Sequence, residues 1–177
     1  ALDAVMEEES LSDRSMLDAQ YSIEETKDGK RYVKADRQVI YGNDPEAWGD
    51  QVEGYINRKI RKGEDVALTT DDGDILLLTS ATEGKASFRN YVRDKNGRLR
   101  PMSDAEYETK LNAETHIDEL AQISERGKKT IPDEGGVHGA FAENGWNYRT
   151  AYFLDFDGKY YRVTLSVAQN SNGKVVY

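Results

Sequence analysis

Residues 147–169, NYRTAYFLDFDGKYYRVTLSVAQ, alternate polar with aromatic and β-branched residues on both sides of the pair Asp157-Gly158. Alternation of this kind is typical of half-buried β-strands, and an Asp-Gly pair between two such runs favours a hairpin. We therefore expect one strand from Asn147 to Asp155, a two-residue turn, and a second strand from Lys159 to Gln169. This hairpin is the strongest local signal in the chain.

A two-residue turn would fix the register and give the hairpin two different faces. The apolar face is expected to pack against helices and would carry Tyr148, Thr150, Tyr152 and Leu154 beside Tyr161, Val163, Leu165 and Val167. The polar face is expected to be open and would carry Arg149, Ala151, Phe153 and Asp155 beside Tyr160, Arg162, Thr164 and Ser166. Guanidinium and hydroxyl groups on a rigid strand suit a phosphate ligand, with Arg162 and Tyr160 as substrate-binding candidates. The alternative is an ordinary solvated sheet face.

Helices and hairpins are predicted before this C-terminal sheet. A helix begins at Asp44-Pro45, which suit the cap and first position, and ends at Gly63. A second begins at the capping box Ser103–Glu106 and is expected to continue to about Arg126. Hairpin turns are expected at 27–30, 71–73 and 96–97, and a third C-terminal strand at 174–177. The pattern predicts an α+β fold, with helices packed on one face of an antiparallel sheet.

The domain organisation follows from length and charge. The chain has 177 residues and a net charge of -9, and its first twenty residues are rich in Asp and Glu. We expect residues 1–20 to form an acidic linker or a loosely docked segment, and residues 21–177 to form a single α+β domain. The acidity disfavours a sequence-independent nucleic-acid coat, because such proteins use basic side chains to neutralise phosphates.

Several classes of site and location are disfavoured. The chain has no cysteine, which excludes disulfides and thiolate chemistry. Apolar runs are too short for a membrane-spanning helix, and we expect no secretion by a classical signal. Asp71–Asp74 resembles the start of a calcium loop but lacks the Glu at its twelfth position, and Thr82–Ser87 departs from the P-loop spacing. We therefore predict neither a metal nor a cofactor.

The two histidines are candidates for acid–base chemistry. His116 lies among apolar helix positions, and His138 lies in a glycine-rich stretch. Two histidines and a cation such as Arg149 would suffice for metal-free RNA cleavage through the 2′-hydroxyl. The structural alternatives are a hydrogen-bonded core histidine for His116 and an exposed loop histidine for His138.

Three stretches carry a resemblance to a known group of domains: 48–66, 114–121, and 148–153 continuing through 160–167. Over about residues 21–177 the chain resembles C-terminal domains of phage head-morphogenesis (MuF-type) proteins and large polyvalent phage proteins. The resemblance implies a barnase–EndoU–colicin–RelE-like fold and a toxin-type RNase. The residues that it implicates as catalytic are His116, His138, Arg149, Thr164 and Ser166.

The favoured hypothesis is therefore a metal-independent RNase-like domain. Its expected partners are RNA, with tRNA as one candidate, an immunity protein, and the N-terminal remainder of a larger phage protein. Its expected location is the bacterial cytoplasm or the virion. Two alternatives stay open: a non-catalytic interaction module, and an ADP-ribosyltransferase-type toxin with Glu143 as the acidic residue, although the chain has no E-x-E pair.

Overall fold

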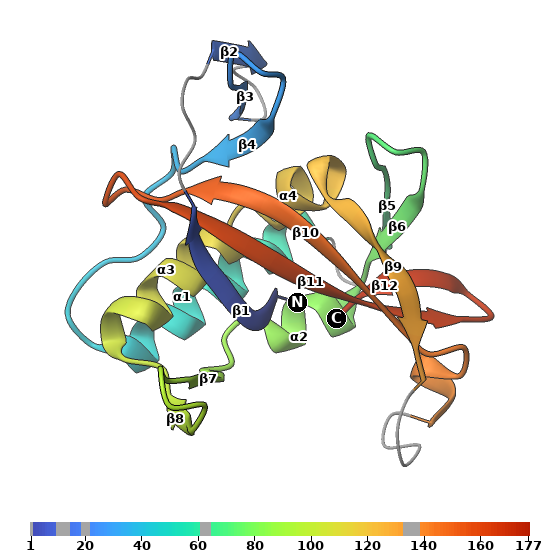
Figure 1. Cartoon of the computed structure of the whole chain (residues 1–177). Coiled ribbons are helices and arrows are strands. Elements are labelled where there is room, and N and C mark those ends of the chain that lie inside the picture. The colour runs from blue at the N-terminus through green and yellow to red at the C-terminus, as the bar shows by residue number, and fades with distance from the viewer. Residues whose placement is uncertain (1, 10–14, 19–21, 61–64, 133–138) are drawn as a thin grey trace.

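The computed structural model describes residues 2–9, 15–18, 22–60, 65–132 and 139–177 (Figure 1). The predicted α+β class is confirmed, since helices accompany a curled, mostly antiparallel ten-stranded sheet. The helices are α1 (Pro45–Lys59), α2 (Ser80–Lys85), α3 (Asp104–Glu114) and α4 (Ile117–Ile123), with a 3-10 turn η2 (Gly139–Ala142). The strands are β1 (Leu2–Glu9), β2 (Ser15–Asp18), β3 (Ile23–Glu25), β4 (Arg31–Lys34), β5 (Val66–Thr69), β6 (Ile75–Leu78), β7 (Tyr91–Arg93), β8 (Leu99–Pro101), β9 (Glu125–Ile131), β10 (Trp146–Leu154), β11 (Tyr160–Asn170) and β12 (Gly173–Val176).

The long β10–β11 hairpin is the centre of the sheet, and each of its edges is shared by two strands. Along the free edge of β10, β4 pairs in parallel at Phe153 and Leu154, while β9 pairs antiparallel from Trp146 to Thr150. Along the free edge of β11, β1 covers one end and β12 the other. The sheet continues from β12 through a parallel pairing with β6 to β5. The sheet therefore departs from the expected antiparallel pattern at two parallel pairings.

The predicted two-residue turn between β10 and β11 is wrong. Asp155 and Lys159 close the hairpin around the three-residue loop 156–158, with the amide of Gly158 donating to the carbonyl of Asp155 over 3.0 Å. Gly158 has a φ of 78°, which an L side chain rarely adopts. The longer loop shifts the register by one residue, so Leu154 rather than Asp155 lies opposite Tyr160.

This shift changes which β10 side chains share a face with which β11 side chains. Cross-strand neighbours point the same way, so the two faces are defined by the observed pairs. The inner face carries Asn147, Arg149, Ala151 and Phe153 beside Tyr161, Val163, Leu165 and Val167. The outer face carries Tyr148, Thr150, Tyr152 and Leu154 beside Tyr160, Arg162, Thr164 and Ser166. The β11 half of each predicted face is therefore confirmed, and the β10 half is exchanged.

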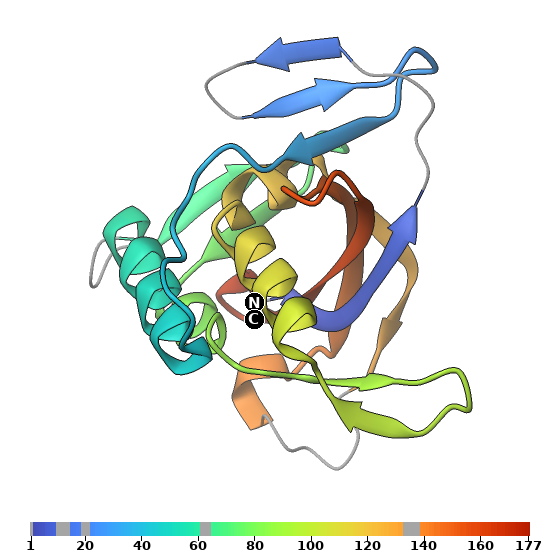
Figure 2. The same cartoon turned by 90° about the vertical axis from the view of Figure 1, so that its left-hand side faces the viewer.

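The inner face packs against the helices, which lie behind β10 and β11 in Figure 1 and to their left in Figure 2. The predicted cap of α1 is confirmed, because the Asp44 side chain accepts a hydrogen bond from the amide of Glu46. The capping box of Ser103 and Glu106 at the start of α3 is confirmed as well. One continuous core joins Val52 and Ile56 of α1, Leu111 of α3 and Leu120 of α4 to Ala151, Phe153, Val163, Leu165 and Val167 of the sheet.

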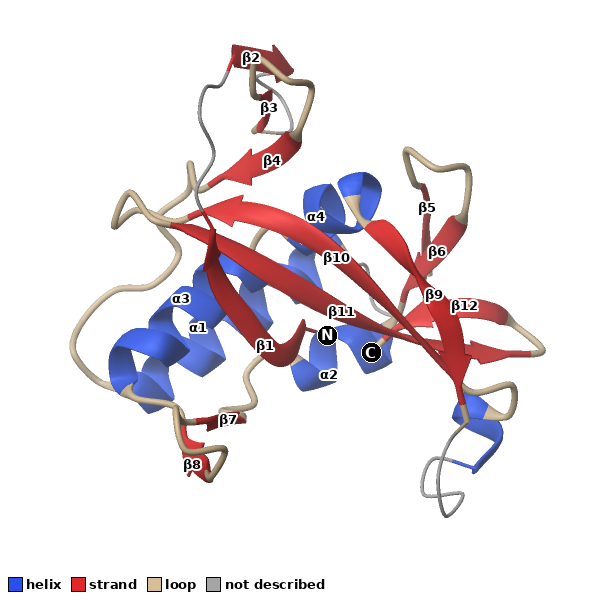
Figure 3. Cartoon of the chain, viewed as in Figure 1, coloured by secondary structure: helices blue, strands red, loops and turns tan. Residues whose placement is uncertain are grey.

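One expectation about secondary structure is wrong. The long helix from Ser103 to Arg126 is broken at Thr115 and His116, so α3 and α4 are separate helices and residue 125 begins strand β9, as the colours in Figure 3 show. The Thr115 hydroxyl donates to the carbonyl of Asn112, and Ser124 ends α4 in an extended conformation. Within residues 1–20, for which we expect an acidic linker or a loosely docked segment, the described residues 2–9 and 15–18 form β1 and β2, which pair with β11 and β3.

Candidate functional site

A cleft of about 370 Å³ opens beside the edge of β10, between the start of β4 and the start of β9. Three connections enclose it: the β3–β4 turn, the β5–β6 turn and the junction of α4 with β9. The polar side chains among the residues that line it are Lys30, Arg31, Asp71, Asp72, Ser124, Glu125, Thr150 and Tyr152. The cleft therefore joins segments that are far apart in the sequence.

Glu125 is the first residue of β9 and lies opposite Thr150, which in turn lies opposite Thr164 on β11. Pairing across these ladders places a carboxylate and two hydroxyl groups in one row on the outer face. Glu125 is exposed, and its carboxylate has no ion pair with any residue that the structure describes. An unpaired carboxylate on a rigid strand is available to accept a proton or a ligand donor.

Cationic groups enter the cleft from the β3–β4 turn. The ammonium of Lys30 lies 3.8 Å from the centroid of the Tyr152 ring. The turn is fixed by the Thr26 hydroxyl, which accepts a hydrogen bond of 3.0 Å from the amide of Lys30. Tyr152 is itself paired with Arg162 on β11. The cleft thus brings an ammonium and a phenol close to the row that contains Glu125.

The β5–β6 turn forms the opposite wall, and an ion cluster around the buried Arg149 holds it in place. Asp71 bonds Arg31 across the cleft mouth. Behind the wall, the guanidinium of Arg149 donates to Asp72 over 2.6 Å and to Asp74 over 2.7 Å. Burial alone would raise the pKa of Asp72, but hydrogen bonds from Thr70 and Arg149 outweigh it and lower the pKa below its ordinary value.

The structure places Arg149 on the inner face, where the predicted register had not put it. Its side chain is only 1% exposed, and it also donates to the hydroxyl and the carbonyl oxygen of Ser124. Every guanidinium nitrogen therefore has a protein acceptor. Arg149 supports one wall of the cleft and does not reach the outer face, so the expectation that it lies on the open face is wrong.

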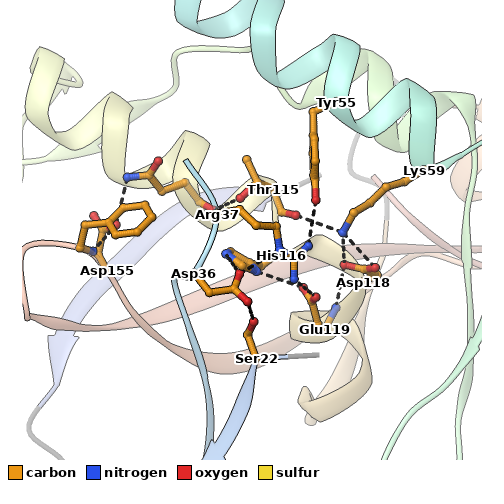
Figure 4. A network of polar contacts seen from close by, with 12 residues as sticks. Ser22, Asp36, Arg37, Tyr55, Lys59, Thr115, His116, Asp118, Glu119 and Asp155 are labelled. Atoms are coloured by element: carbon orange, nitrogen blue, oxygen red, sulfur yellow. Dashed lines mark hydrogen bonds and ion pairs between the residues drawn. The ribbon is translucent and has the colours of Figure 1, made fainter. Parts of the chain in front are cut away.

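His116 is fully buried at the start of α4, within the network shown in Figure 4. Its Nδ1 lies 3.1 Å from Glu119 Oε2, its Nε2 lies 3.7 Å from Asp36 Oδ1, and its ring packs against Phe153. Glu119 also bonds Arg37. Burial alone would raise the pKa of Glu119, but its contacts with His116 and Arg37 lower it below the ordinary range. The surroundings match those of a hydrogen-bonded core histidine.

The other predicted site residues are spread over the outer face and beyond it. Thr164 and Ser166 lie on the outer face. Arg162 lies on the same face of β11, between Thr164 and Tyr160. Tyr160 packs edge-on against Tyr32 and lines a second cleft of about 470 Å³ with Lys34 and Phe156. His138 lies outside the residues that the structure describes. The structure therefore groups Thr164 and Arg162 near the cleft and separates both from His116 and Arg149.

Sequence reasoning missed Glu125, Lys30, Thr150 and Tyr152 as site residues. Glu125 was assigned to the end of a long helix, and the two β10 residues were assigned to the face that packs on helices. The short strand β9 has no clear alternation, so its sequence, ERGKKTI, offered little signal. Glu143, the acidic residue of the transferase alternative, accepts a hydrogen bond from the amide of Ser171 and is not part of the cleft.

No cluster of three or more metal-ligating side chains occurs among the described residues. In the same part of the chain, the helices are too short or too polar to cross a bilayer. No family model matches the chain, and comparison with curated proteins and with solved structures finds no match either. The geometry of the cleft is therefore the basis for any functional proposal.

Proposed function

We propose that this chain is a metal-independent ribonuclease-type domain that binds RNA in the cleft beside Glu125. The observation that carries the proposal is the position of the unpaired Glu125 carboxylate and the Lys30 ammonium in one cleft lined by Thr150 and Tyr152. Cleavage through the 2′-hydroxyl needs a base, a cation for the developing negative charge and a proton for the leaving oxygen. The cleft holds one group for each task.

In the first step, Glu125 accepts the proton of a ribose 2′-hydroxyl, and the 2′-oxygen bonds to the adjacent phosphorus. The cleft is open to solvent, so a single-stranded segment with an accessible 2′-hydroxyl is the substrate that fits it. Thr150 and Thr164 lie in the same row as Glu125 and present hydroxyl donors to the phosphoryl oxygens. This assignment makes Glu125, in place of either histidine, the general base.

Lys30 stabilises the negative charge that develops on the phosphoryl oxygens, because its ammonium is held at the Tyr152 ring and reaches the cleft. As the bond between phosphorus and the 5′-oxygen breaks, the Tyr152 hydroxyl protonates the leaving oxygen. The products are a 2′,3′-cyclic phosphate and a free 5′-hydroxyl. A proton then returns from Glu125 to Tyr152 through water, which restores both groups.

The test is cleavage of a 5′-labelled single-stranded RNA and of total tRNA in EDTA by the purified chain. We expect cyclic-phosphate products from the wild type. Because general-base catalysis contributes about 10²–10⁴-fold, Glu125→Gln should lower the rate by at least about 100-fold. Glu108→Gln, which changes an exposed carboxylate on α3, is the matched control. Absence of cleavage by the wild type, or full activity of Glu125→Gln, contradicts the proposal.

The second candidate is a non-catalytic interaction module. It is favoured by the structural roles of His116 and Arg149, both of which are buried and tied to carboxylates. Binding of labelled RNA without cleavage, and with equal affinity in Glu125→Gln and the wild type, would support this candidate over the ribonuclease. The larger phage protein, the virion or cytoplasmic location and the immunity partner that the resemblance implies stay predictions.

A further inference from the structure

The hairpin of β7 and β8 forms a two-stranded sheet of its own, separate from the main sheet. Figure 2 shows it extending away from the helices as an arm at the lower right. Its inward side is anchored by Val92, which packs against the core, and by Met102, which is buried at its base. We call residues 88–102 the arm.

The arm is strongly basic on an otherwise acidic chain. It contains five cationic residues and a single carboxylate, that of Asp94, whereas the whole chain has a net charge of -9. The Asp94 carboxylate is occupied inside the turn, where it accepts hydrogen bonds from the amides of Asn96 and Arg98. Five cations against one carboxylate leave the arm with a net charge of about +4.

Two of the cations fix the arm to α3 and leave the others for a ligand. Arg89 bonds Asp104 over 2.8 Å, and Arg100 forms a two-pronged pair with Glu106 over 2.6 and 3.0 Å. The pair lowers the pKa of Glu106 to about 2. The remaining cations, Lys95 and Arg98, have no ion-pair partner among the described residues, and Arg93 bonds only the carbonyl of Gly97.

The outward side of the arm combines these cations with exposed apolar groups. In the β7–β8 ladder, Tyr91 lies opposite Pro101 and Arg93 lies opposite Leu99, whereas Val92 faces the core. Tyr91 and Leu99 are each 61% exposed. An aromatic ring beside cations on a solvent-facing strand can stack on an unpaired base while the cations contact the flanking phosphates.

We propose that the arm binds single-stranded nucleic acid, with a base stacked on Tyr91 and phosphates on Arg93, Lys95 and Arg98. An acidic protein surface would form ion pairs with these cations but would not use the exposed Tyr91 ring. Duplex nucleic acid has its bases stacked internally, so the ring favours a single strand. The arm lies at the opposite end of the molecule from the β5–β6 turn that borders the cleft, so it is a second, separate binding surface (Figure 1).

The test is fluorescence anisotropy with a labelled 12-nucleotide oligodeoxythymidine. This probe lacks the 2′-hydroxyl, so it cannot be cut by the proposed mechanism, and the arm variants distinguish binding at the arm from binding in the cleft. Three phosphate contacts predict that the logarithm of the binding constant falls with the logarithm of the salt concentration with a slope of about -2. The combined variant Lys95→Ala/Arg98→Ala should reduce this slope by about 1.4.

Tyr91→Ala should weaken binding by at least about fivefold and leave the salt slope unchanged, because stacking on a base does not release counterions. Arg58→Ala, which removes an exposed guanidinium on α1, is the matched control and should bind as the wild type does. Circular dichroism confirms that each variant is folded. The proposal is overturned if the wild type does not bind the oligonucleotide, if the arm variants bind equally well, or if polyglutamate binds and the oligonucleotide does not.

Discussion

Arg149 lies opposite Leu165 in the β10–β11 ladder, and this pairing turns its guanidinium group toward the helices. There it holds Asp72 and Asp74 of the β5–β6 turn and the end of α4 at Ser124. One side chain of β10 therefore joins two of the three connections that enclose the cleft. Its role is to position the cleft wall. Replacing it should therefore lower the stability of the fold by a measurable amount.

Arg149→Met should lower the free energy of unfolding by about 3 kcal/mol, because it removes the buried cation of the cluster, leaving Asp72 without its ion-pair partner and Asp74 with Lys174 alone. The value lies at the lower end of the usual range, since Asp72 and Asp74 keep some contact with water. Urea unfolding at neutral pH measures the change. Arg58→Met, on the exposed side of α1, should change it by less than about 0.5 kcal/mol.

The same cluster should contribute stability only when its carboxylates are ionised. A hydrogen bond from Lys174, opposed by burial, keeps the pKa of Asp74 below its ordinary value. The unfolded chain therefore binds the proton more readily, so this stability is complete above about pH 4 and is lost as the pH falls through the folded pKa. The difference in unfolding midpoint between wild type and Asp74→Asn should shrink between pH 6 and pH 3.

The pKa of Asp155 is shifted in the opposite direction from that of Asp74. Burial raises its pKa, and hydrogen bonds from the Phe156 amide, Thr109 and Asn112 only partly offset the rise. Its folded form therefore retains the proton at pH values where the unfolded chain has lost it, and its contribution decreases as the pH rises above about 4. Relative to wild type, Asp155→Asn should become less destabilising over that range. A parallel response of both variants would contradict this assignment.

The loop glycine of the β10–β11 hairpin should tolerate no side chain without strain. Gly158→Ala places a Cβ on a residue with a φ of 78°, so we expect a loss of about 1 kcal/mol in the free energy of unfolding. Gly54→Ala, inside α1, meets only the end of the Arg58 side chain at 3.8 Å and should increase stability by about 0.5–1 kcal/mol. Urea unfolding of both variants measures whether the free energy of unfolding falls for Gly158→Ala and rises for Gly54→Ala.

His116→Ala should affect folding and not RNA cleavage. It removes a buried ring from contact with Phe153 and leaves Glu119 without one of its partners, at a cost of about 2–3 kcal/mol. The rate per folded molecule should equal that of the wild type at a temperature where both are folded. A loss of activity as large as that of Glu125→Gln would instead make His116 part of the mechanism.

The sequence predicted the positions of the hairpin turns, but the two-residue length that it predicted for the β10–β11 turn is wrong. Four hairpins share one loop, in which a glycine with positive φ is the third loop residue: Gly29, Gly73, Gly97 and Gly158. In each, the residue three positions before the glycine is Thr or Asp, and its side chain accepts a backbone hydrogen bond in all four hairpins: Thr26, Thr70, Asp94 and Asp155. This spacing indicates the three-residue loop and would have given the correct register.

The cleft could not be predicted from local sequence patterns, because it depends on tertiary contacts. The helix stripe up to Ile123 gives no sign that the chain turns into a strand at Glu125, because Ser124 is acceptable in either structure. The partnership of Glu125 with Thr150 depends on a ladder between β9 and β10, a tertiary contact. The predicted helix starts at Asp44 and Ser103 are confirmed, because each side chain accepts a hydrogen bond from a backbone amide two or three residues further along the chain.

The ladders of β12 and β1 have a consequence for the order in which the chain acquires its structure during synthesis. The β5–β6 hairpin pairs in parallel with β12, through Val175 and Leu77, so this pairing needs the end of the segment. Strand β1 pairs with β11, where Leu2 lies opposite Leu165, so it cannot pair until β11 has been synthesised. Both pairings are highly non-local, and closing such long loops slows folding. Nearly all of this segment would therefore have to leave the ribosome before the sheet that supports the cleft wall is complete.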